Sequence, residues 1–169
     1  VVGAADEVVP MILKGEGIKN TLIISPPGAG KTTMLRDIVR QLSYKSYRVS
    51  VVDERSEIAA LCEGRSAFDL GFSTDILEGV DKAEGMLMVL RSMSPDVIVT
   101  DEIGKQSDID AIERITNSGA AVIATIHGRN IDMIKRRDDL KRMLKFFDLI
   151  ITLSKRKGIG TVEEALTEW

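Results

Sequence analysis

Cysteine, histidine and aromatic residues are scarce in this sequence. Its 169 residues include one cysteine, Cys62, one histidine, His127, and only 4% aromatic residues. A single cysteine can form neither an intrachain disulfide nor a cysteine-based metal site, so we expect a reducing compartment. No apolar run approaches the ~18–20 residues that a membrane-spanning helix requires. These absences exclude disulfide scaffolds and helical membrane domains from the classes to consider.

Neither sign of charge dominates the chain. Lys and Arg number 23 against 26 Asp and Glu, a net charge of −3, so the chain as a whole is not an obvious polyanion binder. Apolar residues make up 44% and charged residues 29%, the balance of a globular domain with a sizeable core. We interpret residues 1–20, which Pro10 interrupts, as a lead-in or linker, and residues 21–169 as one domain. The first residue is Val1 rather than Met, which suggests an excised domain.

The clearest pattern is an apolar strand that runs into a glycine-rich loop and then into a helix. The loop reads Ser25-Pro26-Pro27-Gly28-Ala29-Gly30-Lys31-Thr32-Thr33. Glycines at 28 and 30 can adopt backbone angles that turn successive N–H groups toward one anion. The helix N-terminus adds unpaired donors and a positive dipole end. This order of strand, loop, Lys-Thr and helix predicts a phosphate-binding P-loop.

Within this loop, the residue types predict separate roles. Lys31 is expected to reach the β- and γ-phosphates of ATP, and the Thr32 hydroxyl to bind Mg²⁺. Ser25 stands where the usual pattern has its first glycine, a position that can tolerate a small side chain. The expected nucleotide contacts are Pro27, Gly28, Ala29, Gly30, Lys31, Thr32 and Thr33.

Apolar strands and helical patterns alternate along the rest of the chain. We expect strands near residues 21–25, 48–54, 95–102, 120–126 and 149–153. Helices are expected near 34–42, 57–62, 81–93, 107–118 and 130–145, and residues 64–79 are expected to form an excursion over the surface. This alternation predicts an α/β fold with a parallel sheet covered by helices on both faces.

Acidic residues and the single histidine stand at the ends of predicted strands. Asp101 and Glu102 form a Walker B arrangement, in which Asp101 would hold Mg²⁺ and Glu102 would polarise the attacking water. His127 could hydrogen-bond the γ-phosphate or that water. Glu54 could supply another carboxylate, or form only an ion pair. Because carboxyl ends of parallel strands line a ligand crevice, we expect all four near the P-loop.

Water activation by these carboxylates also predicts the sheet order 5-1-4-3-2, counting the P-loop strand as 1. A strand between the P-loop and Walker B strands gives the carboxylates extra reach toward the γ-phosphate. Direct contact between those two strands would instead favour a small-molecule kinase.

A basic segment leaves a third function open, that of a nucleic-acid translocase. Acidic residues are interspersed and aromatic residues do not alternate with the basic ones, so we favour a solvated helix face and do not expect nucleic acid as a partner. The segment contains Lys135, Arg136, Arg137, Lys141, Arg142 and Lys145.

Several segments together resemble the stage III sporulation protein AA family, which is related to the secretion and pilus-motor ATPases. The segments that match this family are the P-loop through Asp37, residues 52–59, Lys82-Ala83-Glu84-Gly85-Met86 and Arg156-Lys157-Gly158. Residues 90–102 and Ala124-Thr125-Ile126-His127-Gly128 resemble the Walker B segment and histidine box of the secretion and pilus-motor ATPases. The resemblance implies a RecA-like, Mg²⁺-dependent ATPase core with Lys31, Glu102, Glu54 and His127 in catalytic roles.

The resemblance also implies an assembly and a place in the cell. Members are expected to form a ring, which we take as hexameric, and to work with membrane channel proteins between mother cell and forespore. The location would be cytoplasmic, peripheral to the membrane on the mother-cell side. Family members carry a further N-terminal domain, which in related secretion ATPases supplies arginines to the site. We therefore expect slow ATP turnover by these 169 residues alone.

Overall fold

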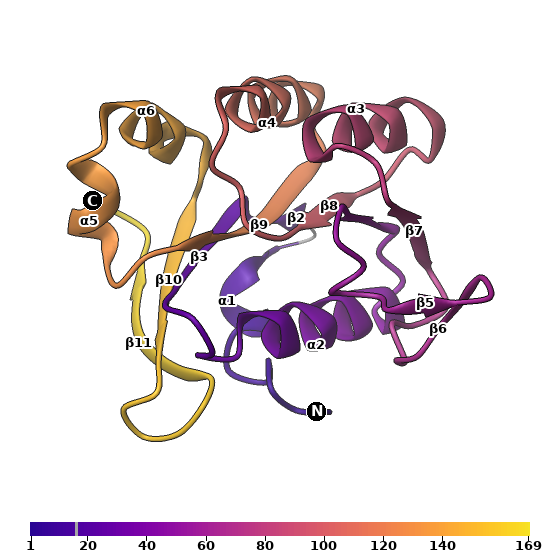
Figure 1. Cartoon of the computed structure of the whole chain (residues 1–169), viewed down its shortest axis with the longest axis horizontal. Coiled ribbons are helices and arrows are strands. Elements are labelled where there is room, and N and C mark those ends of the chain that lie inside the picture. The colour runs from indigo at the N-terminus through magenta and orange to yellow at the C-terminus, as the bar shows by residue number, and fades with distance from the viewer. Residues whose placement is uncertain (16) are drawn as a thin grey trace.

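A seven-stranded sheet forms the centre of the computed structural model, which describes residues 1–15 and 17–169 (Figure 1). Its order is β11-β10-β3-β9-β8-β4-β7, and every neighbouring pair is parallel except β10 and β11. The strands are β3 (Thr21–Ser25), β4 (Val49–Asp53), β7 (Thr74–Glu78), β8 (Val97–Thr100), β9 (Ala121–His127), β10 (Leu149–Ser154) and β11 (Thr161–Leu166). The five strands expected from the sequence therefore have the order 5-1-4-3-2, which confirms that prediction.

Helices cover both faces of this sheet because its central strands are apolar on both sides. In β3, Ile23 packs toward α1 (Val9–Ile12) and α2 (Lys31–Tyr44), whereas Leu22 and Ile24 pack toward the opposite helices. That opposite layer contains α3 (Lys82–Ser92), α4 (Gln106–Ser118), α5 (Ile131–Lys135), α6 (Asp138–Lys141) and the 3-10 helix η1 (Arg142–Phe146). Figure 1 shows the two layers on either side of the sheet.

Two predictions for the segment after β4 are wrong. Residues 57–62 form no helix, because the backbone N–H groups of Glu57, Ile58 and Ala59 donate to the Asp53 carboxylate at 2.8–2.9 Å. The chain then forms a short hairpin of β5 (Leu61–Cys62) and β6 (Arg65–Ser66). The predicted surface excursion at 64–79 includes β7, which extends the sheet beside β4.

The predicted helix at 130–145 is divided into α5, α6 and η1. Arg137 has an extended backbone (φ −101°, ψ 111°) between α5 and α6, and two aspartates begin the next helical turn. Within the described residues 1–15 and 17–169, no helix is both long and apolar enough to cross a bilayer.

The N-terminal segment packs on the domain. Ala5, Val8, Val9 and Ile12 are buried, and the Ala5 N–H donates to Asp37 of α2 at 2.8 Å. Leu13–Lys14 (β1) and Gly17–Ile18 (β2) then pair antiparallel before β3. The boundary at residue 20 stays a prediction, although the burial ties this segment to the core.

Candidate active site

The glycine loop connects β3 directly to α2, as a P-loop requires. Gly28 (φ 68°) and Gly30 (φ 90°) both have left-handed backbones, and Gly30 is the residue immediately before the helix. A side chain is disfavoured at such angles, so both glycines are needed for this conformation. Ser25, in place of the usual first glycine, is fully buried, and its hydroxyl donates to the Pro26 carbonyl at 3.0 Å. The small serine therefore fits the turn.

The turn between β10 and β11 packs against this loop, a contact that sequence reasoning missed. The Gly160 N–H donates to the Ala29 carbonyl at 3.0 Å, and a Cβ at Gly30 would lie 2.8 Å from the Ile159 side chain. A Cβ at Gly28 would lie 2.9 Å from the Lys155 ammonium. Close approach by the turn is therefore a second reason for glycine at position 30, whereas the flexible Lys155 side chain could move away from position 28.

Lys31 and Glu102 meet in an ion pair across the carboxyl edge of the sheet. Lys31 begins α2 after β3, and Glu102 follows β8, with β9 between the two strands. Glu102 also binds Arg55 at 2.9 Å and has a left-handed backbone (φ 41°). Partial burial lowers the pKa of the Lys31 ammonium, an effect that the nearby Asp101 carboxylate opposes. The side chains of the P-loop lysine and the candidate water-activating glutamate are thus in direct contact.

Asp101, one residue before Glu102, is buried with an exposed fraction of 1%, and neither of its carboxylate oxygens has a hydrogen-bond partner. Burial raises the pKa of this carboxyl, and the Lys82 ammonium opposes that rise. Bare, buried carboxylate oxygens suit a cation. No group of three or more His, Cys, Asp or Glu side chains in the described parts of the chain could hold a metal ion. A magnesium site here would therefore need the hydroxyl of Thr32 and phosphate oxygens as further ligands.

Within the described chain, the other two predicted catalytic residues, Glu54 and His127, do not contact Lys31 directly. Glu54, after β4, lies 3.6 Å from the Lys82 ammonium and 3.8 Å from that of Lys105. His127 is exposed at the end of β9, opposite Ser25 in the strand register. It lines a cavity of about 550 Å³ with Pro26, Pro27, Gly128, Arg129 and Met133. His127 is thus beside the P-loop, whereas Glu54 belongs to a lysine-rich cluster.

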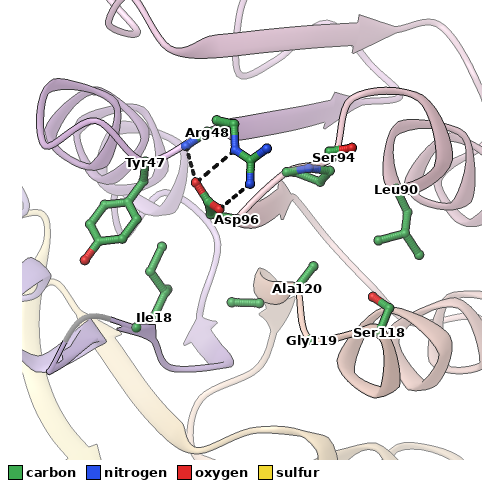
Figure 2. A pocket seen from close by; sticks show the side chains of 12 residues that line it. Ile18, Tyr47, Arg48, Leu90, Ser94, Asp96, Ser118, Gly119 and Ala120 are labelled. Atoms are coloured by element: carbon green, nitrogen blue, oxygen red, sulfur yellow. Dashed lines mark hydrogen bonds and ion pairs between the residues drawn. The ribbon is translucent and has the colours of Figure 1, made fainter.

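A second cavity, of about 580 Å³, lies at the opposite, amino-terminal edge of the sheet (Figure 2). There the backbone N–H of Arg48 donates to Asp96 at 2.8 Å, and its guanidinium binds the same carboxylate at 2.8 and 3.3 Å. This pair joins the segments that precede β4 and β8. Its cation and carboxylate neutralise each other, so we assign the pair a structural role and place the chemistry at the P-loop edge.

The two buried aspartates at this edge differ in hydrogen bonding, which gives opposite predictions for stability. Asp53 accepts three backbone N–H groups, whereas Asp101 accepts none. Because the folded pKa of Asp101 is raised, its ionisation opposes folding as the pH rises above the ordinary carboxyl range. Asp101→Asn should therefore stabilise the nucleotide-free domain by about 1 kcal/mol, or roughly 2–4 °C. Asp53→Asn should destabilise it by about 2 kcal/mol.

Thermal unfolding at neutral pH without Mg²⁺ or nucleotide would measure both changes. Adding Mg-ATP should then raise the melting temperature of the wild type but not that of Asp101→Asn. A lower melting temperature for nucleotide-free Asp101→Asn would contradict this account of the buried carboxylate.

Several solved structures with this architecture are secretion-system ATPases. The Legionella pneumophila ATPase DotB aligns over 87% of this chain and 43% of its own, with a TM-score of 0.62 and 21% identity. The VirB11 ATPase of the Brucella suis type IV secretion system aligns over 95% and 50%, with a TM-score of 0.66 and 15% identity. The chain therefore has the RecA-like fold of the secretion ATPases.

Sequence comparison narrows the class to one family. The model of the family "Sporulation stage III, protein AA" matches residues 1–168, so the chain belongs to that family, as the sequence motifs indicated. Stage III sporulation protein AA of Bacillus subtilis (strain 168) is 40% identical over an alignment of 169 positions, which covers 96% of this chain and 55% of that protein. The protein SEEDLING PLASTID DEVELOPMENT 1 of Arabidopsis thaliana is 29% identical over 85% of this chain and 21% of its own length. The chain thus spans about half or less of these relatives.

Proposed function

We propose that this chain is the Mg²⁺-dependent, ATP-hydrolysing motor domain of a secretion-type machine that acts in sporulation. The observation that carries the proposal is the ion pair of Lys31 with Glu102 at the mouth of the P-loop. In this ion pair, the candidate phosphate-binding cation and the candidate water-activating carboxylate touch each other. A γ-phosphate bound by Lys31 would then lie beside the carboxylate that polarises the attacking water.

In this proposal, the residues at the sheet edge divide the chemistry among them. Backbone N–H groups of residues 28–33 bind the phosphates, and Lys31 exchanges Glu102 for the β- and γ-phosphates. Thr32 and Asp101 would hold Mg²⁺, which when bound neutralises charge on the transferred phosphate. Glu102, released from Lys31, accepts a hydrogen bond from the attacking water. The bare carboxylate oxygens of Asp101 support its assignment.

His127 and Glu54 are assigned supporting roles. His127 lines the cavity beside Pro26 and Pro27, from which its ring can contact the γ-phosphate or the water. Glu54 contributes negative charge next to Asp101, because both carboxylates contact the Lys82 ammonium.

The structure supports two other functions less well than hydrolysis. A small-molecule kinase is disfavoured by the sheet order, because β9 separates the P-loop strand from β8. A nucleic-acid translocase would need basic side chains that can bind phosphates. In the basic segment, the Arg137 guanidinium is already paired with Asp139 at 2.7 Å. Hydrolysis without a phosphate acceptor accounts better for Glu102.

Assembly into a ring, which we propose to be hexameric, would complete the site. In P-loop ATPases an arginine that stabilises charge on the transferred phosphate contributes roughly 10³-fold or more to the rate. We propose that a neighbouring protomer or the N-terminal domain of the native protein supplies this arginine. The ring would act at the mother-cell side of the membrane, with channel proteins of the sporulation complex. The solved pilus retraction motor PilT, which has bound ADP, shares this fold with a TM-score of 0.64 at 20% identity.

This proposal predicts that ATP turnover depends on assembly. Phosphate release per protomer by these 169 residues should be slow and should rise with protein concentration as protomers pair. It should rise at least about tenfold when the native N-terminal domain is restored. The measurement is steady-state phosphate release over a hundredfold range of protein concentration, with light scattering to follow association. Fast hydrolysis that is independent of concentration would remove the argument for a ring.

A further inference from the structure

Lys82 is a buried cation at the candidate active site to which sequence analysis assigned no role. It is the first residue of α3, and its exposed fraction is only 5%. Its ammonium donates to the backbone carbonyl of Glu102 at 3.1 Å. It also lies 3.6 Å from a Glu54 carboxylate oxygen and 3.8 Å from an Asp101 oxygen. Lysine is rarely buried without such partners, so its position requires an explanation.

The start of α3 is fixed close to the sheet, which explains why this lysine is buried. Asp81 caps the helix by accepting the N–H groups of Ala83 and Glu84 at 3.1 and 3.3 Å. Gly85 lets the helix approach β4 closely, because a Cβ there would lie 2.7 Å from a methyl group of Val52. The lysine side chain is thereby directed to the edge where β4 and β8 end.

The backbone N–H and the backbone carbonyl of Glu102 are both hydrogen-bonded. Its N–H donates to the Thr125 hydroxyl of β9 at 2.8 Å, and its carbonyl accepts the bond from Lys82. Glu102 has a left-handed backbone with φ 41°, a conformation that non-glycine residues keep only when their surroundings enforce it. Lys82 is therefore one of two groups that enforce the backbone conformation of the candidate water-activating residue.

We propose that Lys82 is a positioning residue for hydrolysis, an inference that rests on the proposed ATPase function. Its ammonium binds the Glu102 carbonyl and lies between the carboxylates of Asp101 and Glu54. It thereby fixes the positions of all three groups relative to one another. Within the described chain, its hydrogen bond and ion pairs reach Glu102, Glu54 and Asp101 but no P-loop residue, so its removal should alter kcat far more than nucleotide affinity. Lys82 thus acts through Glu102 rather than on the phosphates.

Replacing Lys82 with Met tests this role, because Met keeps the apolar stem but removes the ammonium. Since small misplacements of a catalytic group cost on the order of 100-fold, we expect kcat to fall by about that factor. The Kd for Mg-ATP should change less than about threefold. Lys82→Arg, which restores charge and donors, should recover at least about tenfold of the lost kcat. Lys105→Met is the matched control: Lys105 also contacts Glu54 but is exposed and touches neither Asp101 nor Glu102, and it should lose at most about threefold.

The measurements are nucleotide affinity by calorimetry, phosphate release at one protein concentration, and thermal unfolding of every variant. If Lys82 acts through Glu102, adding Lys82→Met to Glu102→Gln should cause no further loss of kcat. Equal losses in affinity and kcat would show that Lys82 binds the nucleotide itself and overturn the positioning role. An undiminished kcat in Lys82→Met, or a full further loss in the double variant, would overturn it as well. Absence of hydrolysis by the wild type would overturn the proposed function, and this role with it.

Discussion

Replacing Lys31 with Ala is expected to weaken Mg-ATP binding by at least about 100-fold, which is ~2.7 kcal/mol. Lys31 is the only P-loop side chain with a full positive charge, and it supplies charge-assisted hydrogen bonds to phosphate. Its ion pair with Glu102 shows that the ammonium already reaches the crevice at the carboxyl edge. Truncation removes that cation and leaves Glu102 with Arg55 as its remaining ionic partner.

Calorimetric titration with a non-hydrolysable ATP analogue and Mg²⁺ would measure this loss. Lys141→Ala provides a matched control, because Lys141 is an exposed lysine of α6 outside the candidate site. Affinities of the Lys31→Ala and Lys141→Ala variants within threefold of each other would contradict the assignment of the loop as the phosphate site.

The second large effect is expected from Glu102→Gln. Phosphate release should fall by about 10²–10⁴-fold, because the amide cannot accept a proton or polarise the attacking water as the carboxylate does. Affinity for Mg-ATP should be retained or increased. In the wild type, Glu102 competes with the phosphates for the Lys31 ammonium, whereas a neutral Gln competes weakly.

Lys31→Ala should therefore lose affinity for Mg-ATP, whereas Glu102→Gln should keep that affinity and lose phosphate release. Glu164→Gln, at an exposed position of the edge strand β11, makes the same chemical change away from the site and should leave both readouts unaltered. Equal losses of affinity in Lys31→Ala and Glu102→Gln would refute the division of roles between binding and hydrolysis.

The centre of the fold could be predicted because its signals are local. The apolar runs that became β3, β8 and β9 are buried along almost their whole length, and Gly28 and Gly30 mark the loop after the first of them. The strand order followed from the reach that Glu102 needs. Edge strands gave a weaker signal. In β7 and β11, half-buried and exposed residues replace the continuous apolar run, so neither was predicted as a strand.

Parts of the site depend on contacts between distant segments, which no local pattern reveals. Ile58 and Ala59 resemble a helical stretch, yet the Asp53 carboxylate binds their N–H groups and holds them in a turn. The burial of Lys82 depends on Gly85 packing against Val52, a contact that requires the sheet to be assembled. A buried lysine could have been suspected only from its place after a helix-capping aspartate.

Ring size, channel partners and place at the membrane remain proposals that rest on family membership. The chemistry of the site can be tested independently of them, because it depends on residues that one chain brings together. For that purpose, the relevant comparison is between ATP consumption with and without a phosphate acceptor.

The most direct test of the central claim measures ADP and inorganic phosphate formed from Mg-ATP, with no acceptor present, by the chain joined to the N-terminal domain that we propose for the native protein. Hydrolysis by Glu102-activated water predicts equal amounts of ADP and phosphate. Both products should require Mg²⁺ and disappear in Lys31→Ala. ADP formed without free phosphate, or only after an acceptor is added, would show phosphoryl transfer to another molecule. Absence of either product at saturating, bound Mg-ATP would also contradict the account.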